Sequence, residues 1–156
     1  LLTKQFRIPM YVAGVNGGFS YEVCGGTIDK NETPEQSALR ETKEEIGFEV
    51  LNLQKVTTLF LSPGLVREQV HLFIGEYNND SKVESGGGLD EENEEIETLE
   101  VTIDKAFAMI KEQVIVDART MLPQGRLPAR QHLREHSGAE SYGRRWHFQR
   151  PAMVEA

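Results

Sequence analysis

Residues 26–48 read GTIDKNETPEQSALRETKEEIGF, and this stretch decides the fold because it joins a full set of helix signals to charged residues at fixed spacing. The spacing can be written G-x5-E-x7-R-E-U-x-E-E-x-G-U, in which U is an apolar or near-apolar residue. The fixed members of this pattern are Gly26, Glu32, Arg40, Glu41, Glu44, Glu45 and Gly47.

Local signals predict a helix over residues 34–46. Thr33 offers an N-cap hydroxyl, Pro34 suits the first helical position, and Gln36 lies three residues after the cap, which together make a capping box. Gly47 supplies the left-handed residue that ends the helix. Apolar or small residues recur at i, i+3 and i+7 and predict a narrow core-facing stripe of Leu39, Thr42 and Ile46.

Three carboxylates share another face of this helix, because Glu41, Glu44 and Glu45 fall at i, i+3 and i+4. Each like-charged pair at that spacing costs about 0.2–0.5 kcal/mol, and within the helix only Arg40 gives partial relief. Such a face is either a solvated acidic surface or a cation site. Mg²⁺ takes oxygen ligands and is usually held by one or two carboxylates plus phosphates and waters. The pattern as a whole favours the metal site.

The pattern resembles the signature of the Nudix hydrolases, enzymes that bind magnesium and cut the diphosphate of a nucleoside diphosphate linked to another group. The resemblance implies that Glu41, Glu44 and Glu45 are metal ligands, that Glu44 and Glu45 are catalytic, and that the Gly25 carbonyl is a further ligand. Mg²⁺ is the implied cofactor, with Mn²⁺ as an alternative. The structural members of the motif are Gly26, Gly47 and the ion pair of Glu32 with Arg40, which is expected to brace the loop against the helix.

Strand runs around one long helix indicate an α/β sandwich. The resemblance implies the same fold, a mixed β-sheet between helices in an α/β/α arrangement. A second helix is predicted over residues 104–112, and a closing helix begins near Asp117 and meets Pro123, which cannot continue it. Alternating and β-rich runs predict strands at residues 1–8, 20–24, 51–61, 70–77 and 96–103.

Length and composition fit one small enzyme domain. The chain has 156 residues, of which 38% are hydrophobic, enough for a single core. No apolar run approaches the length of a membrane span, and no signal peptide is evident. The lone Cys24 is compatible with a reducing compartment, so we expect a cytoplasmic protein. A net charge of -8 argues against nucleic acid as a partner and means that an anionic diphosphate needs a cation to bind.

Two further segments narrow the substrate class. Pro63 lies fifteen residues past residue 48 and is followed by Glu68, which resembles Nudix enzymes acting on ADP-ribose and other nucleoside diphosphate sugars. A strand-ending turn is the simpler interpretation of Ser-Pro-Gly alone. Arg7, in the run Gln-Phe-Arg, resembles an arginine that reaches the substrate in relatives, and a guanidinium suits bidentate phosphate contact. A surface arginine on an edge strand is the alternative.

The run GGGLDEENEE at residues 86–95 predicts a mobile acidic loop. Three glycines followed by carboxylates also suit an arm that brings a general base over a bound phosphate. The run resembles the loop that carries the catalytic glutamate in ADP-ribose and GDP-mannose diphosphatases. Glu92 and Glu94 both match that position, and the sequence leaves the choice between them open.

The resemblance covers about residues 2–121 and weakens at both ends. We expect a Nudix domain over residues 1–122 that lacks N-terminal strands of its relatives, which form homodimers. Residues 123–156 are rich in Arg and His and match nothing in the family, so we expect an atypical and partly disordered tail.

The predicted activity is Mg²⁺-dependent hydrolysis of a nucleoside diphosphate sugar, such as ADP-ribose or GDP-mannose, to a nucleoside monophosphate and a sugar phosphate. The chief alternative is a catalytically silent Nudix domain that binds a nucleotide sugar as a regulatory module. A hydrolase of nucleoside triphosphates or capped RNA is disfavoured by Pro63 and by the acidic surface.

Overall fold

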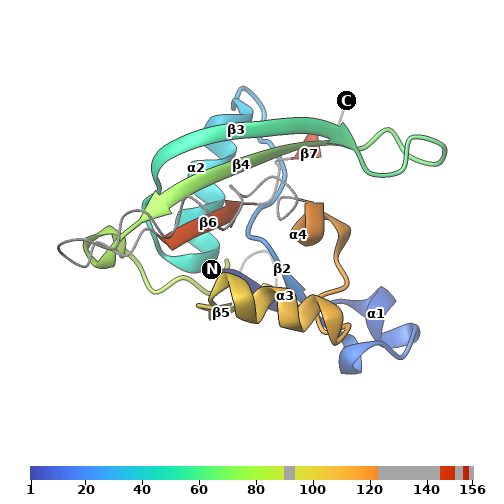
Figure 1. The fold of residues 1–156 in the computed structure, drawn as a ribbon. Helices are drawn as coiled ribbons and strands as arrows, with labels where there is room; N and C mark the ends of the chain where they lie inside the picture. Colours follow the sequence, from blue (N-terminus) through green and yellow to red (C-terminus); the bar gives the residue numbers. More distant parts are fainter. Residues whose placement is uncertain (90–93, 123–144, 150–152, 155–156) are drawn as a thin grey trace.

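Two antiparallel sheets and the helix predicted at residues 34–46 form the frame of the protein (Figure 1). The structure is a computed structural model that describes residues 1–89, 94–122, 145–149 and 153–154. Every strand pair among these residues is antiparallel. The predicted α/β class is confirmed.

The first sheet has the order β2-β1-β5, formed by β1 (Leu2–Phe6), β2 (Phe19–Glu22) and β5 (Glu97–Leu99). Its apolar face packs against α3 (Ile103–Lys111). The core there consists of Leu2, Val23, Met109 and Ile115. Its opposite face is polar, although side chains on it are also buried.

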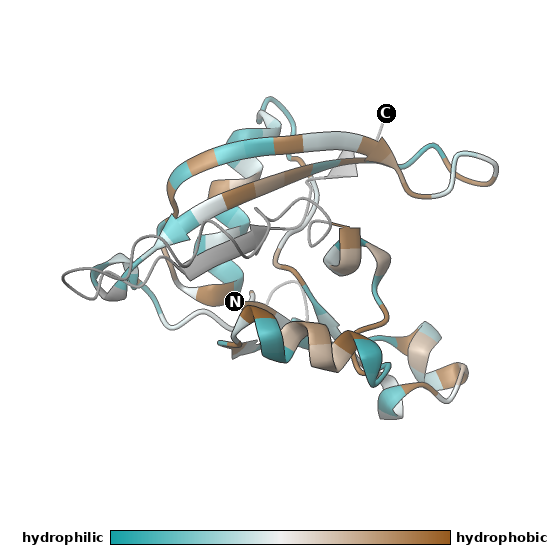
Figure 2. Cartoon of the chain, in the orientation of Figure 1, coloured by the Kyte–Doolittle hydropathy of each residue, from teal (hydrophilic) through white to brown (hydrophobic). Residues whose placement is uncertain are grey.

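The second sheet is built on the hairpin of β3 (Leu51–Phe60) and β4 (Gln69–Tyr77), in which Phe60 pairs with Gln69. Figure 2 shows a long apolar stretch in β4, where Val70, Leu72 and Phe73 are fully buried. The far side of β4 pairs with two short strands of the C-terminal segment, β6 (Arg145–Gln149) and β7 (Met153–Val154). The backbone of the predicted tail thus contributes to this sheet in the part that the structure describes.

The central helix starts and ends where its local signals predict. Thr33 caps α2 (Pro34–Glu41) with the complete capping box, and Gly47 ends the helix at φ +77°. The last stretch, η2 (Thr42–Ile46), is a π-helix. Wider turns change the angular spacing of side chains, and π segments often mark functional sites.

The predicted core stripe of this helix is wrong at one position. Thr42 and Ile46 are buried, but Leu39 is 42% exposed. The buried line before the π segment runs through Ala38 and Glu41 instead. A polar residue therefore occupies a position that the hydrophobic pattern assigned to the surface.

The N-terminal strand prediction runs too far. β1 ends at Phe6, and a short helix, α1 (Ile8–Val12), follows with Pro9 in its first turn. The remaining short elements are 3-10 helices η1 (Asn16–Gly18) and η3 (Asn79–Ser81), together with α4 (Ala118–Met121). Among the described residues, no helix is long and apolar enough to cross a membrane.

Candidate active site

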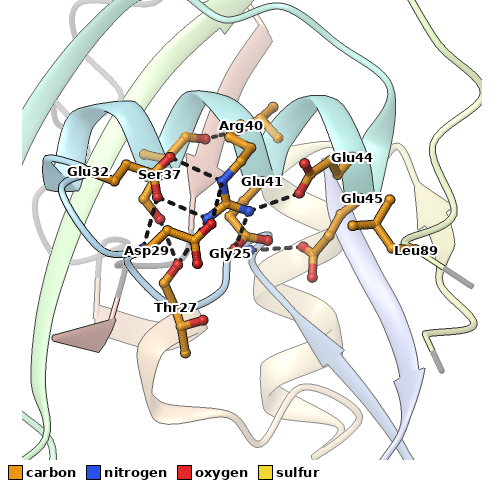
Figure 3. Close-up of polar contacts among 12 residues, drawn as sticks. Gly25, Thr27, Asp29, Glu32, Ser37, Arg40, Glu41, Glu44, Glu45 and Leu89 are labelled. Atoms are coloured by element: carbon orange, nitrogen blue, oxygen red, sulfur yellow. Dashed lines mark hydrogen bonds and ion pairs between the residues drawn. The ribbon is translucent and has the colours of Figure 1, made fainter. Parts of the chain in front are cut away.

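The three predicted metal ligands lie together at the junction of α2 and η2 (Figure 3). Glu41 and Glu45 are buried, at 8% and 1% exposure, and Glu44 is partly exposed. Arg40 lies between them, because its Nη1 donates to Glu41 Oε1 at 3.0 Å and to Glu44 Oε2 at 2.9 Å. One guanidinium thus balances two of the three carboxylates.

The same guanidinium forms the predicted ion pair with Glu32. Arg40 Nε and Nη2 donate to the two oxygens of Glu32, each at 3.0 Å, and Nη2 also donates to the carbonyl oxygen of Thr27 at 3.0 Å. Hydrogen bonding to Arg40 lowers the pKa of Glu32. The bidentate pair ties the loop before the helix to the helix itself, as the pattern predicts.

Glu45 is held on both of its oxygens. The backbone N–H of Gly25 donates to Oε2 at 2.8 Å, and Gln5 Nε2 donates to Oε1 at 3.2 Å. The pKa of Glu45 and that of Glu41 are each raised to about 7, chiefly by burial and to a smaller extent by neighbouring charges that include Glu94. Arg40 offsets the charge of Glu41 and Glu44, whereas among the described residues no ion pair is formed with the buried Glu45.

A hard divalent cation fits this donor set. Carboxylate oxygens are the ligands that Mg²⁺ takes, and its charge would offset the burial of Glu41 and Glu45. Among the described residues, no three Asp, Glu, His or Cys side chains are already spaced around one point as ligands. Instead, Arg40, Gln5 and the Gly25 N–H occupy the carboxylate oxygens, so a cation would have to exchange with some of these contacts. The predicted Gly25 carbonyl ligand stays a prediction.

Gly26 leaves the space in which the carboxylate of Glu41 lies. A Cβ built on Gly26 would overlap the carboxylate oxygens and carbon of Glu41. The motif therefore needs glycine here for a packing reason as well as for its loop.

Gly26→Ala is expected to lower the free energy of unfolding by about 1–3 kcal/mol, because Glu41 must move or the loop must shift. Urea unfolding followed by circular dichroism measures the change. Gly64→Ala is the matched control, since a Cβ at Gly64 meets nothing within 4 Å, and its effect should stay within about 0.5 kcal/mol. Equal stability of the two variants would contradict the packing role of Gly26.

The glycine run at residues 86–88 docks against the end of the π-helix. Gly87 N–H donates to the carbonyl oxygen of Glu45 at 2.8 Å and Gly88 N–H to that of Glu44 at 3.2 Å. All three glycines have positive φ, between +69° and +115°, which other residues rarely adopt. The run thereby satisfies carbonyl groups that the helix end leaves open.

This docking brings Glu94 near the carboxylates. Glu94 packs beside Gly88, and its charge raises the pKa of both Glu41 and Glu45. Glu92 lies outside the described residues. Of the two predicted bases, the described part of the loop therefore places one near the metal ligands, and the assignment stays a prediction.

Arg7 makes a bidentate pair with Glu22, through Nε at 3.2 Å and Nη2 at 3.0 Å. Its side chain is 34% exposed, whereas that of Glu22 is 4% exposed. A substrate contact by Arg7 stays a prediction, and Glu22 would hold the guanidinium in place for it.

Pro63 and Glu68 lie on the loop between β3 and β4, which projects beyond the sheet (Figure 1). Pro63 lines a hollow of about 440 Å³ together with Phe60, Gly64, Leu65, Val66 and Arg67. No hydrogen bond or ion pair within the described part of the chain joins this loop to the carboxylates, so the predicted substrate role of Pro63 and Glu68 stays a prediction.

Gln5 and Glu22 are site residues that sequence reasoning missed. The signal was partial, because Thr3, Gln5 and Arg7 are polar at every second position of the N-terminal strand, although Lys4 between them is polar too. Alternation places all three on one face. That face holds Gln5 against Glu45 and Arg7 against Glu22.

Comparison with known proteins is in line with this geometry. A family model described as NUDIX domain matches residues 1–124. The chain is 41% identical over 122 residues to a GDP-mannose pyrophosphatase of Citrobacter koseri, 40% to that of Pectobacterium atrosepticum and 42% to that of Cronobacter sakazakii. Each alignment covers 78% of this chain and 62% of the relative. The chain thus spans less than two thirds of the length of these relatives.

Proposed function

The chain belongs to the Nudix family, and from this premise we propose that it is an Mg²⁺-dependent hydrolase of nucleoside diphosphate sugars. The reaction cleaves the diphosphate bond with water and yields a nucleoside monophosphate and a sugar phosphate. Members of the family generally need a divalent metal ion. Mg²⁺ is the cation we propose, with Mn²⁺ as a substitute.

The observation that carries this proposal is the buried pair of Glu41 and Glu45 beside Glu44 and Glu94. Burial raises the pKa of Glu41 and of Glu45 to about 7, and carboxylates are not retained in such a place for stability. A catalytically silent module would have no need of this costly set.

Each side chain has a distinct task in the proposed reaction. Glu41, Glu44 and Glu45, with the Gly25 carbonyl, hold the cation, which when bound neutralises phosphate charge and acts as a Lewis acid. Glu94, or Glu92, accepts a proton from the attacking water. Arg7 binds a phosphate oxygen. The ion pair of Arg40 with Glu32 holds the helix that carries the carboxylates against the loop at Gly26.

We propose GDP-mannose as the preferred substrate, because the relatives reported above are named GDP-mannose pyrophosphatases. ADP-ribose and UDP-glucose share the chemistry of the cleaved bond. Pro63 and Glu68 are proposed to contribute to the choice among sugars.

A product-resolved screen of GDP-mannose, ADP-ribose and UDP-glucose in Mg²⁺ tests the proposal. We expect GMP and mannose 1-phosphate in equal amounts as the fastest reaction. Binding of a nucleotide sugar by calorimetry, with no phosphate products from any of the three, would refute the enzyme and favour the silent binding module.

Mg²⁺ is expected to raise the Tm, because a bound cation offsets the buried charges of Glu41 and Glu45. About 1 kcal/mol of binding free energy should raise the Tm by about 2–4 °C in a domain of this size. Differential scanning fluorimetry in EDTA and in Mg²⁺, with NaCl at equal ionic strength as the control, measures it. An unchanged Tm at millimolar Mg²⁺ would contradict binding to the free protein.

The proposal extends to the oligomeric state, the cellular compartment and the domain bounds of the protein. We propose a homodimer in the cytoplasm, with residues 1–122 as the catalytic domain and 123–156 as an additional segment. Exposed apolar side chains of α1 support an interface, and the single buried thiol of Cys24 supports a reducing compartment. The apolar side chains are Ile8, Tyr11 and Val12, at 70%, 62% and 79% exposure.

A further inference from the structure

Two carboxylates are almost fully buried at the polar face of the first sheet, and the protein pairs them in different ways. The side chain of Glu22 is 4% exposed, and its Oε2 lies 3.0 Å from Arg7 Nη2 and 3.5 Å from Arg119 Nη2. Glu45 is 1% exposed, and in the part of the chain that the structure describes no basic side chain forms an ion pair with it. A buried charge without a counter-charge is costly, so the arrangement around Glu45 needs a reason.

The carboxylate of Glu45 is held by neutral donors instead. Gln5 Nε2 donates to its Oε1 at 3.2 Å. The backbone N–H of Gly25 donates to its Oε2 at 2.8 Å (Figure 3). The buried thiol of Cys24 is a further hydrogen-bond partner. These donors fix the direction of the carboxylate but leave its negative charge in place, because none of them carries a positive charge.

The backbone of Glu45 is fixed as well as its side chain. Its carbonyl oxygen accepts the N–H of Gly87 at 2.8 Å and the hydroxyl of Thr98 at 3.5 Å. A side chain held at both ends has little conformational freedom left to lose when it binds a ligand. Each carboxylate oxygen has two lone pairs, so the amide of Gln5 and a cation can share Oε1. Glu45 is therefore preorganised to receive a cation.

Gln5 is placed for this contact by the first sheet. It is buried on β1 and pairs with Ser20 of β2, so the strand backbone sets the position of its side chain. A basic side chain at the same position would hold the carboxylate but also neutralise it, as Arg40 does in part for Glu41 and Glu44. The neutral amide gives the position without the charge.

We propose that Gln5 is a positioning residue of the metal site, whose neutral amide holds Glu45 as the carboxylate with the most uncompensated charge for the cation. This inference rests on the proposed function. Hydrogen-bond partners of metal ligands contribute about 10–100-fold to metal affinity, because they fix the direction of the ligand atoms. The role of Gln5 acts through Glu45 and requires no contact of Gln5 with the substrate.

Metal binding without substrate tests this role apart from turnover. Mn²⁺ is titrated calorimetrically into the unchanged chain, Gln5→Met, Gln5→Lys and Thr3→Val. Methionine keeps the length of the side chain but has no N–H donor, so the Kd for Mn²⁺ should rise about tenfold or more. Lysine places an ammonium group beside Glu45 that competes with the cation, so the Kd should rise about a hundredfold or more.

Thr3→Val is the matched control for a change on the same buried face. Thr3 is buried two residues before Gln5, and its hydroxyl donates to the backbone carbonyl of Glu22 at 3.3 Å rather than to a carboxylate. The Kd of this variant for Mn²⁺ should equal that of the unchanged chain.

The dependence of GMP release on Mg²⁺ concentration gives a second readout. Gln5→Met should need about ten times more Mg²⁺ for half-maximal rate and regain the rate of the unchanged chain at saturation, because a weakened metal site fills at higher concentration. Gln5→Lys should not regain it over the same range.

Near-UV circular dichroism checks folding, and if Gln5→Met does not fold, Gln5→Asn decides through its Kd, because its amide is one methylene shorter. A lower Tm with an unchanged Kd for Mn²⁺ would make Gln5 merely structural and overturns the inference. Tight Mn²⁺ binding by Gln5→Lys, or no Mn²⁺ binding by the unchanged chain, overturns it as well. If the Kd values change as expected but no GMP is released from GDP-mannose, the proposed function alone is refuted.

Discussion

Glu45→Gln is expected to abolish measurable turnover of GDP-mannose in Mg²⁺ while the protein stays folded. Glutamine keeps the shape of the side chain and its carbonyl oxygen can still accept the N–H of Gly25, but it removes the charge and one oxygen ligand. Release of GMP under steady-state conditions measures the loss.

The thermal stability of Glu45→Gln should not fall along with its activity. Burial raises the pKa of Glu45, which means that the charged carboxylate is disfavoured in its site, so a neutral amide should leave the Tm unchanged or higher. Glu35→Gln, on the exposed first turn of α2, is the matched control and should retain full activity. Near wild-type activity of Glu45→Gln in excess Mg²⁺ would contradict the proposal that Glu45 is a metal ligand.

Glu94→Gln is expected to lower kcat by about 10²–10⁴-fold with little change in KM, because a general base contributes to that extent. The charge of Glu94 acts on Glu41 and Glu45, so its carboxylate lies within reach of the site. Glutamine cannot accept the proton but keeps the side chain volume. The pH–rate profile should lose its acidic limb in this variant.

Glu92→Gln is the paired test, since the sequence offers both residues. We expect near wild-type kcat for Glu92→Gln. A loss in Glu92→Gln with full activity in Glu94→Gln would move the base to Glu92. Full activity of both single variants would contradict the role given to the loop.

The helix and its motif were predictable because their signals are local. Thr33, Pro34 and Gly47 set the ends of the helix within the chain itself, and the structure ends it at the same residues. The exposed Leu39 was not predictable in this way, since the burial of a helix face depends on what packs against it. Carboxylates, rather than leucine, turn inward, and the proposed functional site would account for this departure from the hydrophobic pattern.

The partners of the site were harder to foresee, because they are distant in sequence. Glu22 and Arg119 are separated by 97 residues, and Gln5 and Glu45 by 40. Periodicity places Gln5 on a strand face, but only the pairing of β1 with β2 and the packing of the helix bring it to Glu45. The strands of the C-terminal segment were also missed, because pairing with β4 is a long-range contact.

The most direct measurement of the central claim is formation of GMP from GDP-mannose by the unchanged chain, followed in Mg²⁺ and in EDTA. The buried carboxylates of Glu41 and Glu45 predict GMP and mannose 1-phosphate in equal amounts with Mg²⁺, no product in EDTA, and recovery when Mg²⁺ is added back. Product formation that is the same with and without the cation, or an absence of product despite bound GDP-mannose, would contradict it.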